Sequence, residues 1–142
     1  MSLPINVLED SFDLVAPRGE ELIERFYDRL FATAPELKPL FAGTDMARQR
    51  QMLLGALVLL RKSLRDLDPI VPKLRELGAR HVAYGARPEH YPVVGATLIA
   101  AMAAIAGSEW RPEYDRAWSA AFELVADAML EGAAQAEPAL AA

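Results

Sequence analysis

Apolar residues recur along this chain every three or four positions, the spacing of one buried face of an α-helix. No segment shows the sustained two-residue alternation that indicates a half-buried strand. The pattern predicts helices at about residues 6–16, 22–31, 46–64, 73–84, 91–106 and 112–133, with a short helical piece at 35–41. Six or seven helices of unequal length, joined by irregular connectors, favour an all-α fold that is not a symmetric four-helix bundle.

The chain has the size of one domain. It has 142 residues, of which 53% are hydrophobic, and contains no internal repeat. We therefore expect a single domain over residues 1–142. The alanine-rich segment at about 134–142 lacks an apolar face, so we expect a frayed tail there.

Charge and composition exclude several classes of function. A formal net charge of −5 argues against a nucleic-acid partner, because phosphate contacts require clustered Lys and Arg. The absence of cysteine removes disulfides and thiolate chemistry and fits a reducing compartment. The longest uncharged run, residues 91–108, is too short and too rich in Gly and Ala for a membrane span. Without a signal peptide at the start, the expected location is the cytoplasm, with no membrane contact.

Three polar side chains fall on predicted apolar faces. His81 lies four residues after Leu77 and three after Gly78, whose missing side chain leaves space for something bulky to approach the backbone. Tyr27 and Gln49 point inward on two other helices. Each has an ordinary structural interpretation: a buried histidine or tyrosine bonded to carbonyls, and a glutamine at the boundary of a stripe.

The chemistry open to an inward histidine is limited in this chain. His81 and His90, nine residues apart and without cysteine, match no closed zinc spacing. Neither a G-x-S-x-G elbow nor a glycine-rich phosphate loop is present. Axial ligation of an apolar cofactor remains, of which haem is the common case. A purely structural buried histidine stays open as the alternative.

The order of several motifs resembles a bacterial globin. FYDRLF is followed by PELKPLF, then by Gln49 with Leu53 one turn later, then by LGARH and HYPVVG, and then by AW in a long last helix. The pattern is most similar to single-domain bacterial haemoglobins and to the globin domain of flavohaemoglobins. It covers about residues 6–133. The resemblance implies a globin fold of six to seven helices around a haem pocket.

The resemblance also implies residue roles around the haem. His81 matches the histidine that binds the iron, and Phe41 matches a phenylalanine that packs against the porphyrin. Tyr91 matches a tyrosine that hydrogen-bonds to the proximal imidazole. His90 precedes that tyrosine and has no ligand role in the pattern.

On the distal side, Tyr27 and Gln49 match the polar pair over the open coordination position. Leu53 matches the apolar residue that crowds the bound gas. A hydroxyl donor such as Tyr27 would favour dioxygen over a less polar gas such as carbon monoxide.

Two departures from the family pattern bear on function. Flavohaemoglobins carry a glutamate in the last helix, and its register falls on Ala133, whereas Glu131 lies about 200° away around the helix. A missing carboxylate weakens the case for peroxidase-like chemistry. The sequence also ends at Ala142, before any flavin or nicotinamide domain.

The function that the resemblance implies is reversible binding of dioxygen and other diatomic gases by haem b (heme b), for oxygen transport or storage. Nitric oxide dioxygenation would additionally need a separate reductase, and no residue is assigned a catalytic role. The alternative is a globin-type gas or redox sensor that acts through a protein partner. A structural helical interaction module is a third reading, in which the inward polar residues coincide by chance.

Overall fold

The computed structural model describes the backbone of residues 3–141 and the side chains of residues 3–135. This part of the chain forms six α-helices: α1 (Ile5–Val15), α2 (Gly19–Thr33), α3 (Met46–Ser63), α4 (Val71–Ala83), α5 (His90–Ala106) and α6 (Pro112–Ala141). Four short 3₁₀ helices join them: η1 (Ala16–Arg18), η2 (Pro35–Phe41), η3 (Asp68–Ile70) and η4 (Gly107–Glu109). The all-α prediction is confirmed, and each predicted helix is present.

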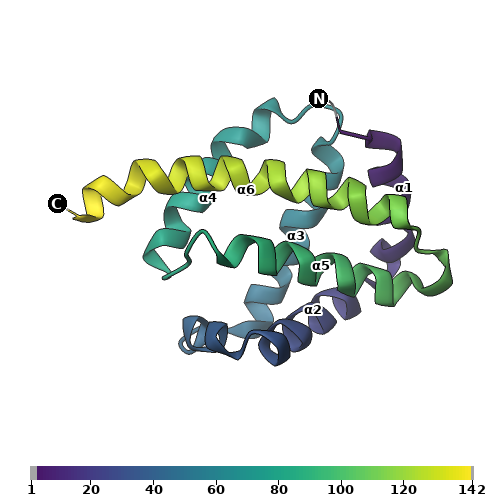
Figure 1. Ribbon diagram of the computed structural model, residues 1–142, viewed down its shortest axis with the longest axis horizontal. Coiled ribbons are helices and arrows are strands. Elements are labelled where there is room, and N and C mark those ends of the chain that lie inside the picture. The colour runs from purple at the N-terminus through teal and green to yellow at the C-terminus, as the bar shows by residue number, and fades with distance from the viewer. Residues whose placement is uncertain (1–2, 142) are drawn as a thin grey trace.

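The helices pack at steep as well as shallow angles. In Figure 1, α5 and α6 lie side by side and antiparallel, and α2 runs along the other side of α5. Helix α3 crosses behind them at a steep angle, and α4 packs against α6. This arrangement leaves the facing sides of α3 and α4 on opposite walls of one space, where the candidate site lies.

Local signals in the sequence explain where several helices begin and end. The carboxylate of Asp45 accepts hydrogen bonds from the backbone N–H groups of Ala47 and Arg48, at 3.1 and 3.4 Å, and so caps α3. At the other end of the core, Gly107 has a φ of +61°, a conformation that costs glycine little, and ends α5.

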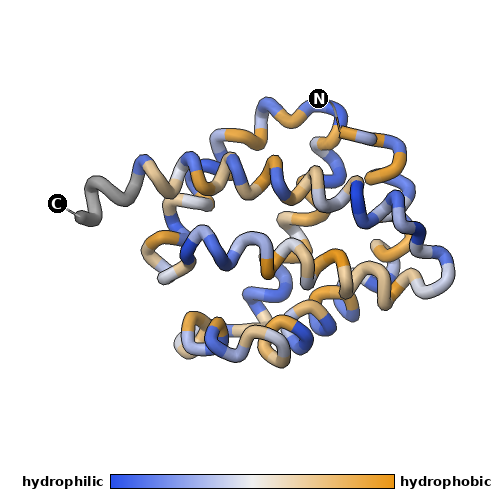
Figure 2. Tube along the Cα trace, viewed as in Figure 1, coloured by the Kyte–Doolittle hydropathy of each residue, from blue (hydrophilic) through white to orange (hydrophobic). Residues whose placement is uncertain are grey.

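A buried hydrogen bond connects the first and last helices, α1 and α6. The indole N–H of Trp118 donates to the hydroxyl of Ser11 at 2.9 Å, and Ser11 in turn donates to the carbonyl of Val7 at 2.7 Å. Phe12 packs on the same indole, with ring centroids 6.0 Å apart. Figure 2 shows hydrophobic and hydrophilic residues alternating along α6, as expected for a helix with one buried face.

Helix α5 is the most apolar element. By length and composition alone, His90–Glu109 could cross a membrane. Residues on α5 such as Leu98, Ala101 and Met102 are instead buried in contact with α2 and α6, as in the core helix of a folded domain. The run therefore forms a helix with one face buried in the domain.

The last helix differs from its predicted extent. The backbone remains helical to Ala141, eight residues beyond the predicted end at Ala133. Side chains from 136 onward and Ala142 lie outside the described residues. The frayed tail at 134–142 and the single-domain assignment therefore stay predictions.

Candidate functional site

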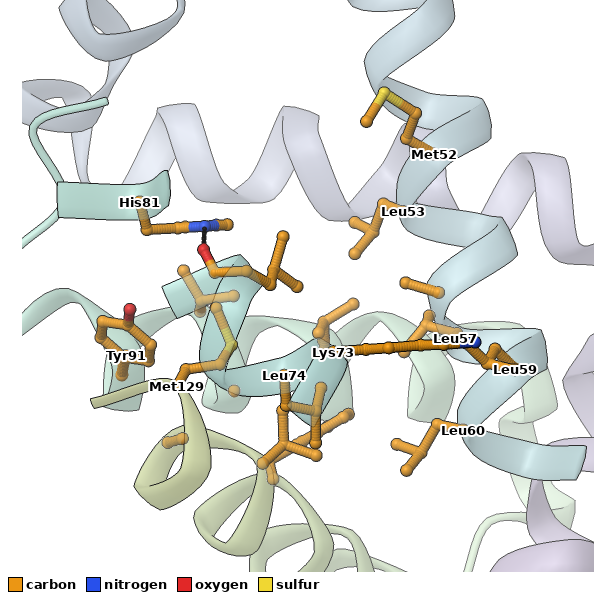
Figure 3. A pocket seen from close by; sticks show the side chains of 18 of the residues that line it. Met52, Leu53, Leu57, Leu59, Leu60, Lys73, Leu74, His81, Tyr91 and Met129 are labelled. Carbon is orange, nitrogen blue, oxygen red and sulfur yellow. Dashed lines mark hydrogen bonds between the residues drawn. The ribbon is translucent and has the colours of Figure 1, made fainter. Parts of the chain in front are cut away.

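A cavity of about 530 Å³ lies among α3, α4, α5 and α6. Its walls are largely aliphatic: Leu53, Leu57 and Leu60 come from α3, and Val125 and Met129 come from α6. Figure 3 shows the α3 leucines on one side of this space and α4 on the other. Among the described residues, no acidic side chain lines it. The cavity therefore suits a largely apolar ligand rather than a cationic one.

His81 projects from α4 into this space, toward Leu53 of α3 (Figure 3). Its Nδ1 atom lies 2.7 Å from the carbonyl oxygen of Leu77, one turn earlier. Because a carbonyl oxygen can only accept, Nδ1 must carry the hydrogen, and the neutral ring then has its lone pair on Nε2. That lone pair is the group that a metal ion would bind.

The surroundings of His81 favour the neutral imidazole. Burial lowers the pKa of the ring most strongly, because a charged ring is poorly solvated there. The Leu77 carbonyl opposes this by raising the pKa, and the charge of Arg80 lowers it again. A neutral imidazole is the form that can ligate.

The predicted distal residues form a second group. The side-chain amide of Gln49 donates to the hydroxyl oxygen of Tyr27 at 3.1 Å. Tyr27 is only 5% exposed, and burial raises the pKa of its phenol, so the hydroxyl keeps its proton. Phe41 packs edge-on against the Tyr27 ring, with centroids 5.8 Å apart. Since the Tyr27 oxygen accepts from Gln49, its own proton is left to donate elsewhere.

The six predicted site residues fall into two groups of three in the structure. His81, Leu53 and Tyr91 line the cavity, whereas Tyr27, Gln49 and Phe41 do not. The groups are linked through α3, because Gln49 lies one turn before Leu53. The tyrosine–glutamine pair therefore stands at one end of the cavity wall that faces His81.

Tyr91 occupies the cavity wall without the bond that the resemblance implied. In Figure 3 it lies beside the α4 segment that carries His81. Within the described residues its hydroxyl makes no hydrogen bond to the imidazole, and the Leu77 carbonyl takes Nδ1 instead. Burial raises the pKa of Tyr91, which keeps it a neutral phenol. The orientation of the imidazole is therefore set within α4 itself.

The last helix places its residues as its register predicted. Ala133 is buried, and the carboxylate of Glu131 points away and pairs with Arg75 at 3.0 Å. The Glu131 side chain is 54% exposed, so it supplies no carboxylate to His81.

Replacing Glu131 with glutamine should therefore leave the proximal side unaltered. We expect a change of about 0–1 kcal/mol in the free energy of unfolding, since exposed ion pairs contribute little, and unchanged haem spectra. Thermal denaturation and ultraviolet–visible spectra measure both. A displaced spectrum would show that Glu131 reaches the histidine after all.

Sequence reasoning missed several residues on the cavity wall. His90, to which no ligand role was given, lines the cavity, and its Nδ1 accepts from the backbone N–H of Arg87 at 3.0 Å. Lys73 and Arg80 also line it. His90 begins α5, where helical periodicity carries no information on its direction. For Arg80, the only sequence feature that could have indicated a place on the cavity wall was its position directly before the inward His81.

The space beside Gly78 proved to be occupied by protein. A Cβ atom built there would lie 1.8 Å from the backbone oxygen of Met129 on α6. Something bulky does approach the backbone at Gly78, as expected, and it is a neighbouring helix rather than a ligand. The absence of a side chain at Gly78 indicates that another group comes close to the backbone, but the sequence does not show which group.

Comparison with known proteins identifies the fold. The globin family model matches residues 24–129, which is more than half of the chain. This chain belongs to the globin family. The cavity between α3 and α4, with His81 and His90 on its wall, is therefore the cavity of a globin.

The curated relatives of this globin are longer proteins. It is 32% identical over 128 residues to a flavohemoprotein of Bacillus subtilis, covering 89% of this chain and 32% of that protein. A flavohemoprotein of Rhodopirellula baltica is 33% identical over 139 residues, covering 95% of this chain and 34% of that protein. The globin thus spans about a third of the length of these relatives.

Solved structures support the same assignment. A bacterial globin from Campylobacter jejuni matches with a TM-score of 0.79 and 26% identity, over 92% of this chain and 94% of that one. An engineered carbene transferase, a putative nitric oxide dioxygenase from Rhodothermus marinus, matches with a TM-score of 0.87 and covers 97% of this chain and 96% of that one. Its identity is 22%, so it bears on the fold alone. The resemblance to bacterial globins and flavohaemoglobin globin domains is confirmed.

Proposed function

We propose that this globin binds haem b in the α3–α4 cavity, with His81 as the axial ligand of the iron, and takes up dioxygen and other diatomic gases reversibly. The observation that supports this most is the bond from His81 Nδ1 to the Leu77 carbonyl. It fixes the tautomer that leaves Nε2 free on a cavity wall. A carbonyl that accepts from the other ring nitrogen in this way also orients ligating histidines in metal sites.

The cavity fits this cofactor in size and chemistry. Its volume of about 530 Å³ lies within the range of roughly 300–1,000 Å³ that is usual for small-molecule sites. Aliphatic side chains on α3 and α6 suit a flat apolar macrocycle. Lys73 and Arg80 line the same cavity without an acidic neighbour among its described residues, which suits the two carboxylates of haem.

When bound, haem supplies the iron at which the gas binds, and the protein determines what surrounds that gas. Gln49 holds the Tyr27 oxygen, so the Tyr27 proton is available to a negatively polarised gas atom. Leu53, on the same helix as Gln49, presents an aliphatic surface to the cavity and excludes water. We therefore assign Tyr27, Gln49 and Leu53 to the distal side, opposite His81.

This distal arrangement favours dioxygen transport or storage, and it also allows oxidation of nitric oxide to nitrate. Continued turnover of nitric oxide would require electrons from a reductase outside the globin domain. We assign no residue of this domain a catalytic role. The absence of cysteine and the net charge of −5 fit a cytoplasmic setting without nucleic-acid partners.

The test is a set of absorption spectra of the purified protein reconstituted with haem, in the ferric, ferrous and oxygenated states, followed by addition of nitric oxide. We expect a five-coordinate ferrous form, a stable oxygenated form, and a single conversion to the ferric form on adding nitric oxide. Added reductant and a flavin reductase should make this conversion repeat. Failure to bind haem under any reconstitution condition would overturn the proposal.

A further inference from the structure

We propose that Gly78 and Gly132 are positioning residues for His81: by allowing the backbones of α4 and α6 to touch, they fix where the proximal imidazole stands in the cavity. This inference rests on the proposed ligation of haem iron by His81. It assigns a role to two residues that carry no side chain.

The contact between the two helices is reciprocal. A Cβ atom at Gly78 would lie 1.8 Å from the backbone oxygen of Met129, and one at Gly132 would lie 1.9 Å from the backbone oxygen of Arg75. On each helix, the glycine and the opposing carbonyl are three residues apart. Both distances are far below the 3.0 Å that real Cβ contacts respect, and both clashes are with backbone. Any side chain at either position must therefore move one helix away from the other.

The remaining glycines of the described chain do not share this geometry. At Gly43 and Gly55 an added Cβ would meet nothing within 4 Å. At Gly19 and Gly95 it would meet only side-chain atoms, of Leu54 and of Phe122. Backbone contact is thus particular to the crossing of α4 and α6.

This crossing lies directly behind the histidine. Gly78 is three residues before His81, on the same face of α4, and it follows Leu77, whose carbonyl orients the imidazole. On the other helix, Met129 contributes both the opposing carbonyl and a side chain that lines the cavity. A change in the spacing at Gly78 would therefore move His81 and Leu77 relative to the cavity wall that α6 forms.

No side-chain network on the proximal side takes over this task. The only hydrogen bond of the His81 ring within the described residues goes to Leu77, on its own helix. Ala133 offers no hydrogen-bonding group, and the carboxylate of Glu131 pairs with Arg75 in solvent. The imidazole consequently moves with α4, and the position of α4 is set by its contact with α6. We conclude that backbone contact at the two glycines holds the iron ligand in place.

The test compares Gly78→Ala, Gly132→Ala and the control Gly43→Ala, each as the full chain reconstituted with haem. The first readout is the iron–histidine stretching band in the resonance Raman spectrum of the ferrous form. The second is the rate of haem transfer to an excess of a haem-scavenging protein. We expect both crossing variants to shift the band and to release haem about tenfold faster or more, as when a metal ligand loses the groups that orient it, with no change in the control. Folded crossing variants with an unmoved band and an unchanged release rate would overturn the inference.

If a crossing variant does not fold, a second measurement tests the inference: amide hydrogen exchange of the unaltered, haem-bound protein. Because α4 and α6 share a backbone contact, amides following Arg75 and amides near Gly132 should exchange at similar rates. Exchange in α4 at least tenfold faster than in α6 would contradict the inference. Absence of an iron–histidine band in the unaltered protein would instead refute His81 ligation, so the two failures are distinguishable.

Discussion

Replacing His81 with glycine should abolish the iron–histidine band of the ferrous protein and speed haem release by more than about 100-fold, since loss of the groups that merely orient a metal ligand costs about 10–100-fold in metal affinity. The substitution removes the ring nitrogen, Nε2, that the bond from Nδ1 to Leu77 leaves with a free lone pair on the cavity wall. It also leaves a space of the size of an imidazole ring.

Adding imidazole to His81→Gly should restore a five-coordinate ferrous spectrum, because the free ligand can enter that space. Glu131→Gln provides the matched control, since its carboxylate pairs with Arg75 outside the cavity. Absorption spectra and haem-transfer kinetics measure both effects. Unchanged ferrous coordination in His81→Gly would show that another residue binds the iron.

Replacing Tyr27 with phenylalanine should increase the dioxygen dissociation rate about 10- to 100-fold, the equivalent of roughly 1.5–3 kcal/mol for a hydrogen bond to a charged partner. The ring would still pack against Phe26 and Phe41, with centroids 4.8 and 5.8 Å away, so the change removes a donor and little packing. Carbon monoxide dissociation should change less, because this gas is a weaker acceptor.

The variant Gln49→Leu separates the two distal residues. It removes the amide that donates to Tyr27 at 3.1 Å but keeps the tyrosine proton, so the dissociation rate should rise less than in Tyr27→Phe. Stopped-flow replacement of dioxygen by carbon monoxide measures both rates. If Tyr27→Phe releases dioxygen at the original rate, the proton of Tyr27 does not face the gas.

Much of the fold could be predicted because its signals are local. The spacing of apolar residues predicts every α-helix of the described residues, and the acceptor side chain of Asp45 marks the start of α3. The direction of a side chain around its own helix is equally local. Tyr27 and Ala133 are therefore buried and Glu131 is exposed, as their registers indicate.

The site was less predictable, because it depends on which elements meet. Tyr91 was expected to bond the imidazole, but the Leu77 carbonyl, on the same helix as His81, already occupies Nδ1. His90 was given no role at the site, yet it lines the cavity. A sequence motif indicates that two residues such as His81 and Tyr91 lie near one another. Whether they form a hydrogen bond depends on distances of a few tenths of an ångström, which the motif does not specify.

The sequence by itself determined the helices, the faces that they bury and the inward direction of His81, Tyr27 and Gln49, since all of these follow from the period of a single helix. Only the tertiary structure decided what lies opposite each face. Gly78 illustrates the difference: its missing side chain signals close approach, but the sequence does not show whether a ligand or a helix approaches. Packing placed the backbone of α6 there, at Met129, whereas His81, about one turn further along α4, lines the cavity.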